Sequence, residues 1–389
     1  MRFEFATATR IVFGPGAFRE IGPLLAEMLP GERPTRVLVV TGRTPEDTEP
    51  LRNQLEDAGL KSIAFAVAGE PTIEMVQTGT QLAREENCAA VIGFGGGSAL
   101  DTGKAIAALL TNPGDLLDYL EVVGRNRPLL HPPVPCIAVP TTAGTGAEVT
   151  RNAVLASTAH KVKVSLRSPL MLPRLALIDP ELTLGLPPAA TATTGMDALT
   201  QLIEAFVSLK ANPLTDGLCR EGISRVGRSL LRAYRDGRDL AARTDMCIAS
   251  LFSGLALANA GLGAVHGFAA PLGGMFSAPH GAVCAALLPE AMEINTRALR
   301  EREPDNPASA RYAEVGRLLT GAPAADAEQA IQWVHRLREE LAIPTLRNHG
   351  VTEADLPILV EKGQQASSMK GNPIALTPDE LREILRRAM

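Results

Sequence analysis

The chain has 389 residues, of which 46% are hydrophobic and 21% charged, and it carries a net charge of −5. This composition excludes a disordered or fibrous chain, and its slightly acidic balance gives no support for nucleic-acid binding, which usually needs a basic face. Because single hydrophobic cores stop growing at roughly 250 to 300 residues, the length predicts two domains.

The first half of the chain alternates short apolar runs with helical stretches. Buried strands are predicted over residues 36–42, 62–67, 89–95, 136–141 and 175–180, and the segments 48–59 and 73–87 between them have helical spacing of apolar residues. This order predicts a mostly parallel sheet covered on both faces. We therefore expect a Rossmann-like α/β domain over residues 1–185.

The strand signals fade after about residue 186. Helices are predicted over 189–208, 215–237, 241–261, 308–321, 326–342 and 377–389, and several begin at a Thr or Asp cap. Prolines rather than a long linker mark the boundary. The second domain, 186–389, is thus expected to be all-helical and to meet the first domain across a cleft.

The five cysteines are scattered and show no CxxC spacing, which fits neither a disulfide framework nor a zinc knuckle. The N-terminus lacks the apolar core of a signal peptide, and no apolar run reaches the ~20 residues that span a bilayer. We therefore expect a cytoplasmic protein that does not bind membranes.

A glycine-rich loop at 93–105, "GFGGGSALDTGKA", follows a predicted strand and begins a predicted helix. Glycines there let the backbone approach a phosphate, and the helix N-terminus supplies partial positive charge. The loop fails both the P-loop and the strict GxGxxG spacing, so phosphate binding and a structural turn both remain open. Ser98 and Asp101 fit either as ligands of phosphate and of ribose or nicotinamide, or as capping residues.

A second loop, "VPTTAGTGAEVTRN" at 139–152, also follows a predicted strand. Thr141, Thr142 and Thr145 offer hydroxyl groups beside two glycines, which suits a nucleotide lying over the ends of the strands. An ordinary turn with Thr caps would explain the same residues.

A composite metal site is suggested by residues from two segments. His266 and His280, two of six histidines, lie in the glycine-rich stretch 261–289, and Asp197 lies on the predicted helix "GMDALTQLIEA". Carboxylate and imidazole are ordinary ligands of divalent metals. Gln201, one helical turn after Asp197, is a neutral amide where a second metal ligand would fit. The alternative is that both histidines are satisfied core residues.

Together these segments resemble the iron-containing (group III) alcohol dehydrogenases. The resemblance rests on "GGGSALDTGKA", "PTTAGTGAEVT", "GMDALTQLIEAFVS", "NAGLGAVHG", "PLGGMF" and "PHGAVCAALLP", in family order across nearly the whole chain. It implies the dehydroquinate-synthase-like architecture of a nucleotide-binding domain and a helical domain. It also implies hydride transfer between a small alcohol or aldehyde and NAD or NADP in the cleft.

The resemblance assigns roles residue by residue. Asp197, His266 and His280 match three metal ligands and would form the catalytic centre, with Fe²⁺ or Zn²⁺ as Lewis acid. Gln201 stands where the family has a fourth ligand, usually His. The implied cofactor contacts are Gly96, Gly97, Ser98, Asp101, Thr141, Thr142, Thr145, Asn152 and Lys163.

Three departures from the family pattern affect the expected chemistry. Gln201 is a weaker ligand than imidazole, so metal affinity should fall, the ion should differ or the site should be empty. The alternative is that Gln201 binds substrate while three protein ligands and a water hold the metal. Ala270 replaces a His that relays protons in many relatives. Gly42 stands where NAD-preferring relatives have an Asp, and Arg43 follows it, which favours NADP or dual use as the bound nucleotide. Arg43 as a solvated loop residue is the alternative.

Alternatives remain open at this point. A maleylacetate-reductase-like enzyme would act on an oxoacid, possibly without metal, and Lys370 is its only loose candidate for binding a carboxylate. A non-redox lyase or an inactive nucleotide-binding protein could have the same fold. The apolar segment 3–14 could pair with a neighbouring copy, so we expect a homo-oligomer, most simply a dimer. The substrate itself is not predicted.

Overall fold

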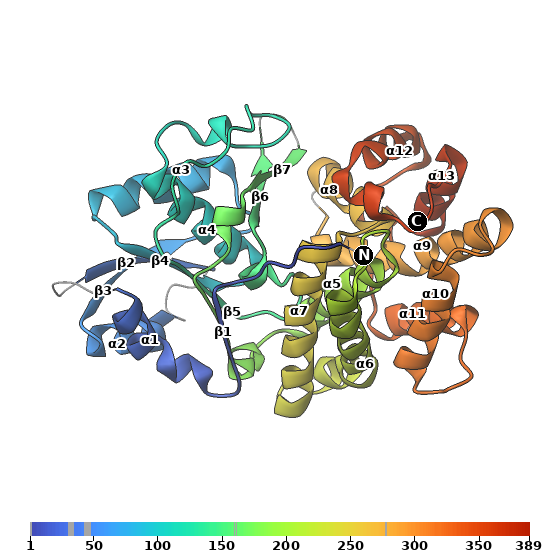
Figure 1. Cartoon of the computed structure of the whole chain (residues 1–389), viewed down its shortest axis with the longest axis horizontal. Coiled ribbons are helices and arrows are strands. Elements are labelled where there is room, and N and C mark those ends of the chain that lie inside the picture. The colour runs from blue at the N-terminus through green and yellow to red at the C-terminus, as the bar shows by residue number, and fades with distance from the viewer. Residues whose placement is uncertain (1, 30–34, 43–47, 159, 161, 277) are drawn as a thin grey trace. The chain divides into compact units, whose positions relative to one another are not determined.

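A computed structural model describes residues 2–29, 35–42, 48–158, 160, 162–276 and 278–389. It divides into two compact units (Figure 1). The α/β unit comprises Thr7–Thr142 and Ala147–Thr183, and the helical unit comprises Met1–Ala6, Ala143–Gly146 and Leu184–Met389. The last change of unit lies between residues 183 and 184, where the sequence predicted 185 and 186. Residues 143–146 belong to the helical unit although they lie within the predicted first domain.

The α/β unit is built on a parallel sheet of six strands, in the order β1-β8-β5-β4-β2-β3. The strands are β1 (Arg10–Phe13), β2 (Thr35–Thr41), β3 (Leu60–Ala66), β4 (Ala90–Gly95), β5 (Cys136–Pro140) and β8 (Leu175–Ile178). The parallel sheet confirms the predicted fold class. The sequence did not predict β1, because its residues, unlike those of β8, are not a run of fully buried side chains. Pairing with β8 is what makes them a strand.

Helices cover both faces of this sheet (Figure 1). Alternate residues of β2 enter two separate cores, as the side-chain period of a strand requires. Val37 and Val39 pack with α1 (Ile21–Met28) and α2 (Glu49–Asp57). Leu38 and Val40 pack in the other core, to which α3 (Ile73–Glu85) and α4 (Gly97–Thr111) contribute. Burial on both faces explains why the central strands are continuous apolar runs.

An antiparallel hairpin, β6 (Asn152–Ser157) and β7 (Val162–Arg167), follows β5 and was not predicted. Only alternate residues of β6, such as Ala153 and Leu155, are buried. A hairpin that is covered on one face has no continuous apolar run. The pattern used to find the central strands therefore could not find it.

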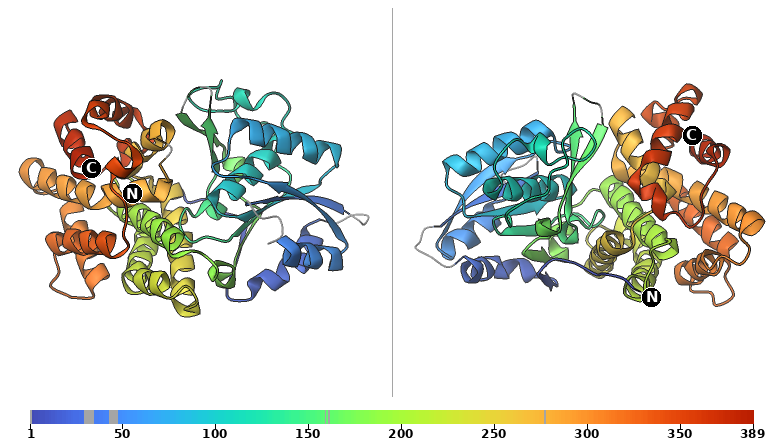
Figure 2. Two further views of the ribbon diagram at one scale, coloured as in Figure 1. Left: turned by 180° about the vertical axis from the view of Figure 1, so that it is seen from behind. Right: turned by 45° about the horizontal axis from the view of Figure 1, so that its top comes forward.

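Described residues from Leu184 onward form helices and short turns, and no strand lies among them (Figure 2). The helices are α5 (Pro188–Val207), α6 (Pro213–Arg235), α7 (Leu240–Ala260), α8 (Ala264–Phe276), α9 (His280–Arg302), α10 (Ala308–Thr320), α11 (Ala327–Glu340), α12 (Leu356–Gln365) and α13 (Pro378–Arg387). The central helix is α5, which packs against α6, α7 and α9. This confirms the all-helical second domain.

Helix α7 is long and apolar enough to cross a membrane by length and composition alone. However, 61% of its most apolar 18-residue window is buried inside the structure. Met246, Ala249, Leu251 and Ala256 are among its buried side chains. We therefore interpret α7 as a core helix of the helical unit.

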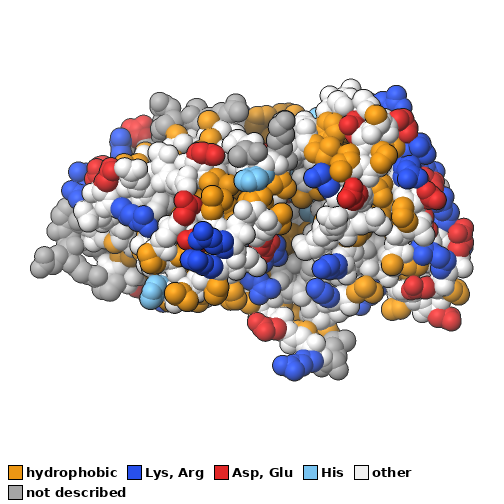
Figure 3. Space-filling view, turned by 90° about the horizontal axis from the view of Figure 1, so that it is seen from above, with side chains coloured by type: hydrophobic (Ala, Val, Ile, Leu, Met, Phe, Trp, Pro, Cys, Tyr) orange, Lys and Arg blue, Asp and Glu red, His pale blue; other side chains and the backbone are white. Residues whose placement is uncertain are grey.

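The surface of the helical unit carries charges of both signs, interspersed on the face in Figure 3. Ion pairs of this kind join α9 to α13: Arg297–Glu383, Arg302–Glu380 and Arg387–Glu293. Each such exposed pair stabilises the fold by only about 0 to 1 kcal/mol. Together they neutralise three arginines of α9 and α13.

Glu148, in the 3₁₀ turn Ala147–Val149, is a buried carboxyl group and is 2% exposed. Burial raises the pKa of Glu148 to about 7, although a backbone hydrogen bond and Lys104 oppose the shift. Between pH 4.5 and 7 the unfolded state has lost a proton that the folded state retains, so stability falls as pH rises. The loss is at most about 3 kcal/mol.

Glu148→Gln is therefore expected to stabilise the protein relative to wild type at about pH 8 and to have little effect at about pH 5. Chemical denaturation at both pH values measures the difference. Glu86→Gln, at a partly exposed ion-pairing position on the same unit, is the control. Equal effects of Glu148→Gln at the two pH values would contradict the buried, protonated carboxyl group.

Candidate metal centre and nucleotide site

Helix α5 positions two buried carboxylates on one face. Asp197 and Glu204 are two helical turns apart, a spacing that directs both side chains to the same side of a helix. Their exposed fractions are 2% and 6%. Burying an isolated carboxylate costs folding free energy, so each of these groups needs a hydrogen-bond donor or a positively charged partner.

His266, on α8, is held by Glu204. Nδ1 of His266 lies 2.6 Å from Oε2 of Glu204, while the backbone N–H of Val265 donates to Oε1 of Glu204 at 2.7 Å. With Nδ1 donating to the carboxylate, Nε2 is the nitrogen left to bind another group. That atom lies 3.4 Å from Oδ1 of Asp197.

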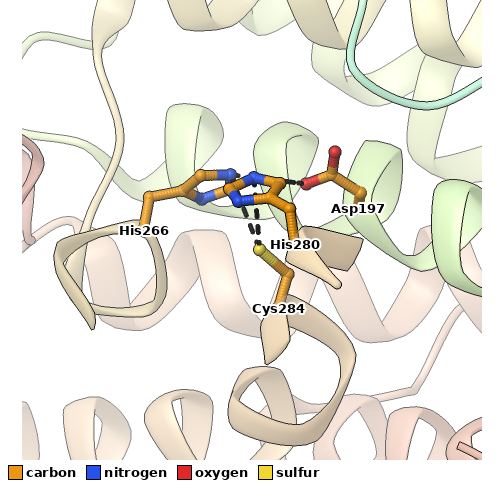
Figure 4. A group of neighbouring side chains, drawn as sticks. All are labelled: Asp197, His266, His280 and Cys284. Carbon is orange, nitrogen blue, oxygen red and sulfur yellow. Dashed lines mark hydrogen bonds and ion pairs between the residues drawn. The ribbon is translucent and has the colours of Figure 1, made fainter. Parts of the chain in front are cut away.

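The N-terminus of α9 brings two more candidates to the same place (Figure 4). His280 is its first residue, with Nε2 at 3.5 Å from Oδ1 of Asp197, and Cys284 follows one turn later. Gly281 allows this close approach, since a Cβ there would overlap the backbone oxygen of Thr193 on α5. A bulkier residue at 281 would displace the beginning of α9.

Ligand atoms of Asp197, His266, His280 and Cys284 all lie within 4.8 Å of one another. Oδ1 of Asp197 is buried, yet it accepts no hydrogen bond in the described part of the chain. Its imidazole neighbours stand farther away than the usual hydrogen-bond length of about 2.9 Å. An orphaned carboxylate oxygen facing two imidazole nitrogens fits a divalent metal ion, which would satisfy all three atoms.

Strong charge coupling accompanies this geometry. Burial would raise the pKa of Asp197, but His280 and His266 hold it well below its usual range. The Cys284 sulfur, followed by Asp197, raises the pKa of His280 to about 10 against the effect of burial. Burial likewise opposes the change at Cys284, whose pKa His280 and His266 lower. A metal ion would replace the protons that hold this cluster together.

The structure also shows the surroundings of Gln201 and Ala270, two of the departures from the family pattern. Gln201 is 2% exposed, and its Oε1 accepts a hydrogen bond of 2.7 Å from the hydroxyl of Ser253 on α7. Ala270 is exposed on α8, one turn after His266. The side-chain oxygen of Gln201 thus already has a partner, and residue 270 offers no group that could carry a proton.

The predicted nucleotide contacts of the α/β unit gather where strands end. Gly42 follows β2, Gly96 follows β4 and Thr141 follows β5, and these three strands are neighbours in the sheet. A Cβ on Gly95 would lie 3.5 Å from the backbone nitrogen of Gly42, which shows how closely the ends of β2 and β4 approach. The strand order reverses here, the usual position of a ligand in an open α/β sheet.

Glycines also bring α4 close to the sheet. A Cβ on Gly93 would lie 3.0 Å from the Cα atom of Leu100, and one on Gly103 would lie 3.4 Å from the Cα atom of Gly93. Gly96 caps α4 with extended backbone angles, and Gly97 and Ser98 form its first turn. Their backbone N–H groups lie at the end of the helix that attracts anions.

Asp101 and its neighbours have structural partners. Its Oδ2 accepts the backbone N–H of Val154 at 2.9 Å, and its Oδ1 pairs with Nζ of Lys104 at 2.9 Å. Lys104 is fully buried and also donates to Thr150 and to the backbone oxygens of Ala147 and Asn152. This network joins α4 to the hairpin, a structural role beside the predicted cofactor contact of Asp101.

The remaining predicted cofactor contacts lie on different elements of the structure. Lys163 on β7 pairs with Glu70 at 2.6 Å, and Thr142 packs beside Gly96. Thr145 belongs to the loop 143–146 of the helical unit. Arg43 lies outside the described residues.

Glycines explain why that loop joins the helical unit. A Cβ on Gly144 would lie 2.6 Å from Thr194 on α5, and one on Gly146 would lie 2.7 Å from Gly254 on α7. Gly146 also has a φ of +61°, which favours glycine. The glycines of "TTAGTG" thus have a packing role independent of any nucleotide.

Sequence reasoning missed Glu204, Cys284 and Ser253. Helical spacing could have found Glu204, since it lies seven residues after Asp197 on a predicted helix and therefore on the same face. Cys284 lies four residues after His280, but the sequence predicted no helix there, so this spacing carried no signal. The contact between Gln201 and Ser253 joins two different helices and leaves no such signal.

Comparison with known proteins agrees with this fold. Residues 8–180 match the family model "Iron-containing alcohol dehydrogenase", and residues 191–389 match "Fe-containing alcohol dehydrogenase family, C-terminal". The 1,3-propanediol dehydrogenase of Klebsiella pneumoniae is 37% identical over 99% of this chain and 98% of its own length. Alcohol dehydrogenase 4 of Saccharomyces cerevisiae (strain YJM789) is 38% identical over 87% of this chain and 86% of its own.

The same similarity is seen in three dimensions. The solved structure of the alcohol dehydrogenase from Oenococcus oeni has a TM-score of 0.90 and 32% identity, with both chains covered completely. The chain belongs to the iron-containing alcohol dehydrogenase family. It is accordingly an oxidoreductase that acts on CH–OH donors, which sets aside the lyase and the inactive binding protein.

Glu204→Ala is expected to weaken metal binding by about 10- to 100-fold, because removing a carboxylate that orients a ligating imidazole typically has an effect of this size. Glu204→Gln should lose less, since the amide oxygen can still accept from Nδ1 of His266. Titration with Zn²⁺ against a competing chelator gives the affinities, and Glu314→Ala on the surface of the same unit is the control. Wild-type affinity in Glu204→Ala would contradict this role.

Proposed function

We propose that the protein is an NAD(P)-dependent alcohol dehydrogenase and aldehyde reductase whose divalent metal is held by Asp197, His266 and His280. The observation that carries the proposal is the buried, unpartnered Oδ1 of Asp197 facing the Nε2 atoms of both histidines. A metal ion bound there supplies a Lewis acid for the oxygen of the substrate. Family membership supports the reaction class.

The residues of this chain then have distinct tasks. Glu204 fixes the tautomer and orientation of His266, and Gly281 sets the position of His280. The N-terminus of α4 binds the pyrophosphate of the nucleotide through the N–H groups near Gly97 and Ser98. The nicotinamide supplies the hydride chemistry, and the protein orients it.

The nucleotide is proposed to be NADP, or either NAD or NADP. Among the described residues, no atom lies within 4 Å of the position of a Cβ on Gly42 at the end of β2, apart from its own neighbours in the chain. An Asp at this place would repel a 2′-phosphate; glycine does not. Arg43, next in the sequence, adds a positive charge to this segment.

The substrate is proposed to be a small alcohol or diol. Relatives with names such as 1,3-propanediol dehydrogenase and NAD-dependent methanol dehydrogenase support a small alcohol or diol. Lys370, the candidate that an oxoacid substrate requires, is exposed on the turn Ser367–Gly371.

The proposed assembly is a cytoplasmic homodimer. Strand β1 supports it as an edge strand, which pairs with β8 on one side only. Sedimentation of the purified protein tests the assembly; a monomer at all concentrations would exclude it.

Absorbance of the reduced nicotinamide tests the reaction. Purified protein loaded with Fe²⁺ or Zn²⁺ is assayed with NAD and NADP against alcohols and diols, and with NADH and NADPH against aldehydes and one oxoacid. We expect turnover with small alcohols and aldehydes. Turnover with the oxoacid alone would favour the maleylacetate-reductase-like alternative, and no turnover with any combination would contradict the dehydrogenase.

A further inference from the structure

Cys284 is the cysteine that lies beside the two histidines of the proposed metal centre. Its sulfur lies 3.8 Å from Nε2 of His266 and 3.7 Å from Nε2 of His280, the two nitrogens that also face Asp197 (Figure 4). The side chain is buried. Cys284 therefore points into the centre where Oδ1 of Asp197 lacks a hydrogen bond.

These spacings can be compared with those between ligands around one ion. With Zn–N and Zn–O lengths of about 2.0 to 2.2 Å and a Zn–S length of about 2.3 Å, a tetrahedral site separates oxygen from nitrogen by about 3.4 Å and sulfur from nitrogen by about 3.6 Å. The structure has 3.4 and 3.5 Å for the two oxygen–nitrogen pairs, and 3.7 and 3.8 Å for the two sulfur–nitrogen pairs. These four of the six pairs are thus spaced as in one coordination tetrahedron, and all four atoms lie within 4.8 Å of one another.

Gln201 competes with Cys284 for the fourth position. Its carbonyl oxygen accepts the hydroxyl of Ser253 at 2.7 Å, so coordination would require that hydrogen bond to break. Cys284 needs no such change, because its contacts in this centre are the two imidazoles themselves. A thiolate is also a far better ligand than a neutral amide for zinc and similar ions.

We propose that Cys284 is the fourth protein ligand of the metal, which gives one oxygen, two nitrogen and one sulfur donor from Asp197, His266, His280 and Cys284. On binding, the thiol releases its proton to solvent and the sulfur binds the ion as thiolate. This donor set selects Zn²⁺ over Fe²⁺, because thiolate and imidazole in tetrahedral geometry suit zinc and the general order of affinities also favours it. The inference rests on the metal centre of the proposed function and names its fourth ligand.

Cobalt substitution tests the sulfur ligand without reference to activity. Co²⁺ bound by a thiolate gains a charge-transfer band in the near ultraviolet, which a site of oxygen and nitrogen donors lacks. The Co²⁺ spectrum and the Zn²⁺ affinity are measured for wild type, Cys284→Ala, Cys284→Ser and Gln201→Ala. Cys219→Ala, at a buried cysteine on α6 of the same unit, is the matched control.

We expect the band in wild type, Gln201→Ala and Cys219→Ala, and its loss in both Cys284 variants. Zn²⁺ affinity should fall by about 100-fold or more in Cys284→Ala. This exceeds the usual effect of removing a residue that only hydrogen-bonds to a metal ligand. Far-ultraviolet circular dichroism shows whether each variant is folded; if Cys284→Ala is not, the nearly isosteric Cys284→Ser decides.

Two other outcomes would overturn the inference. Bound Co²⁺ without the band in wild type would exclude sulfur ligation, and a loss of affinity in Gln201→Ala but not in Cys284→Ala would assign the fourth position to Gln201. Nicotinamide turnover measured on the same samples separates these outcomes from failure of the proposed function. A protein that turns over alcohol but lacks the band would retain its function and lose only this ligand.

Discussion

His280→Ala is expected to lose bound metal and to lower kcat/KM by about 1,000-fold or more. His280 supplies one of the two nitrogens that face Asp197, and its loss leaves an incomplete set of donors around a buried carboxylate. If Lewis-acid stabilisation amounts to about 4 kcal/mol, its removal corresponds to about three powers of ten in rate. Elemental analysis of the purified variant and initial rates with nicotinamide measure the two effects.

The control for this change is His349→Ala, in the turn Leu346–His349 of the same helical unit. His349 is partly exposed and does not belong to the Asp197 cluster. It should retain both metal and activity. A His280→Ala variant that remains active with a full metal content would refute the proposed centre.

Gly96→Asp is expected to raise the KM for the nucleotide by about 100-fold without changing the metal content. Residue 96 caps α4 with φ −76° and ψ −174°, angles that any residue can adopt. Aspartate is a favoured helix cap, so the fold should tolerate it. Its carboxylate would, however, lie where the pyrophosphate is proposed to bind, and repulsion between near charges is worth a few kcal/mol.

Gly96→Asn separates charge from size in this experiment. Asparagine caps helices as well as aspartate does and has nearly the same shape, but it is neutral. Both variants must accommodate Thr142, whose Cγ2 atom would lie 3.3 Å from the new Cβ. Equal KM values for Gly96→Asp and Gly96→Asn would show that the nucleotide phosphates do not bind at this helix terminus.

Sequence patterns predicted the central strands, which are buried on both faces, and the longer helices. The continuous apolar strands β2, β4 and β5 and the helices α5, α6 and α7 are long enough for hydrophobic periodicity to identify them. The hairpin β6–β7 and the strand β1 could not be found in this way, because partners elsewhere in the chain decide their structure. The same holds for α8 and α9, whose glycines and prolines weaken the helical signal although close packing requires them.

The residues of the candidate site also differ in whether the sequence alone could identify them. Asp197, His266 and His280 are chemically informative residues in the amino-acid sequence itself, whereas Cys284 looks there like one of five scattered cysteines. Only the fold shows that its sulfur faces the two imidazoles. Likewise, the sequence identifies Gln201 as a departure from the family, but its bond to Ser253 depends on how α5 packs against α7.

The loop 143–146 limits how the protein can be divided into separately expressed fragments. Since the chain leaves the α/β unit after Thr142 and re-enters it at Ala147, no single cut yields both units intact. A fragment beginning near residue 184 would lack Gly144 and Gly146, which fill narrow spaces against α5 and α7. The exposed gap would lie beside the helix that carries Asp197. The N-terminal residues up to Ala6 also belong to the helical unit. Separate expression of the helical part is therefore best achieved by supplying both segments through redesigned connections rather than by truncation.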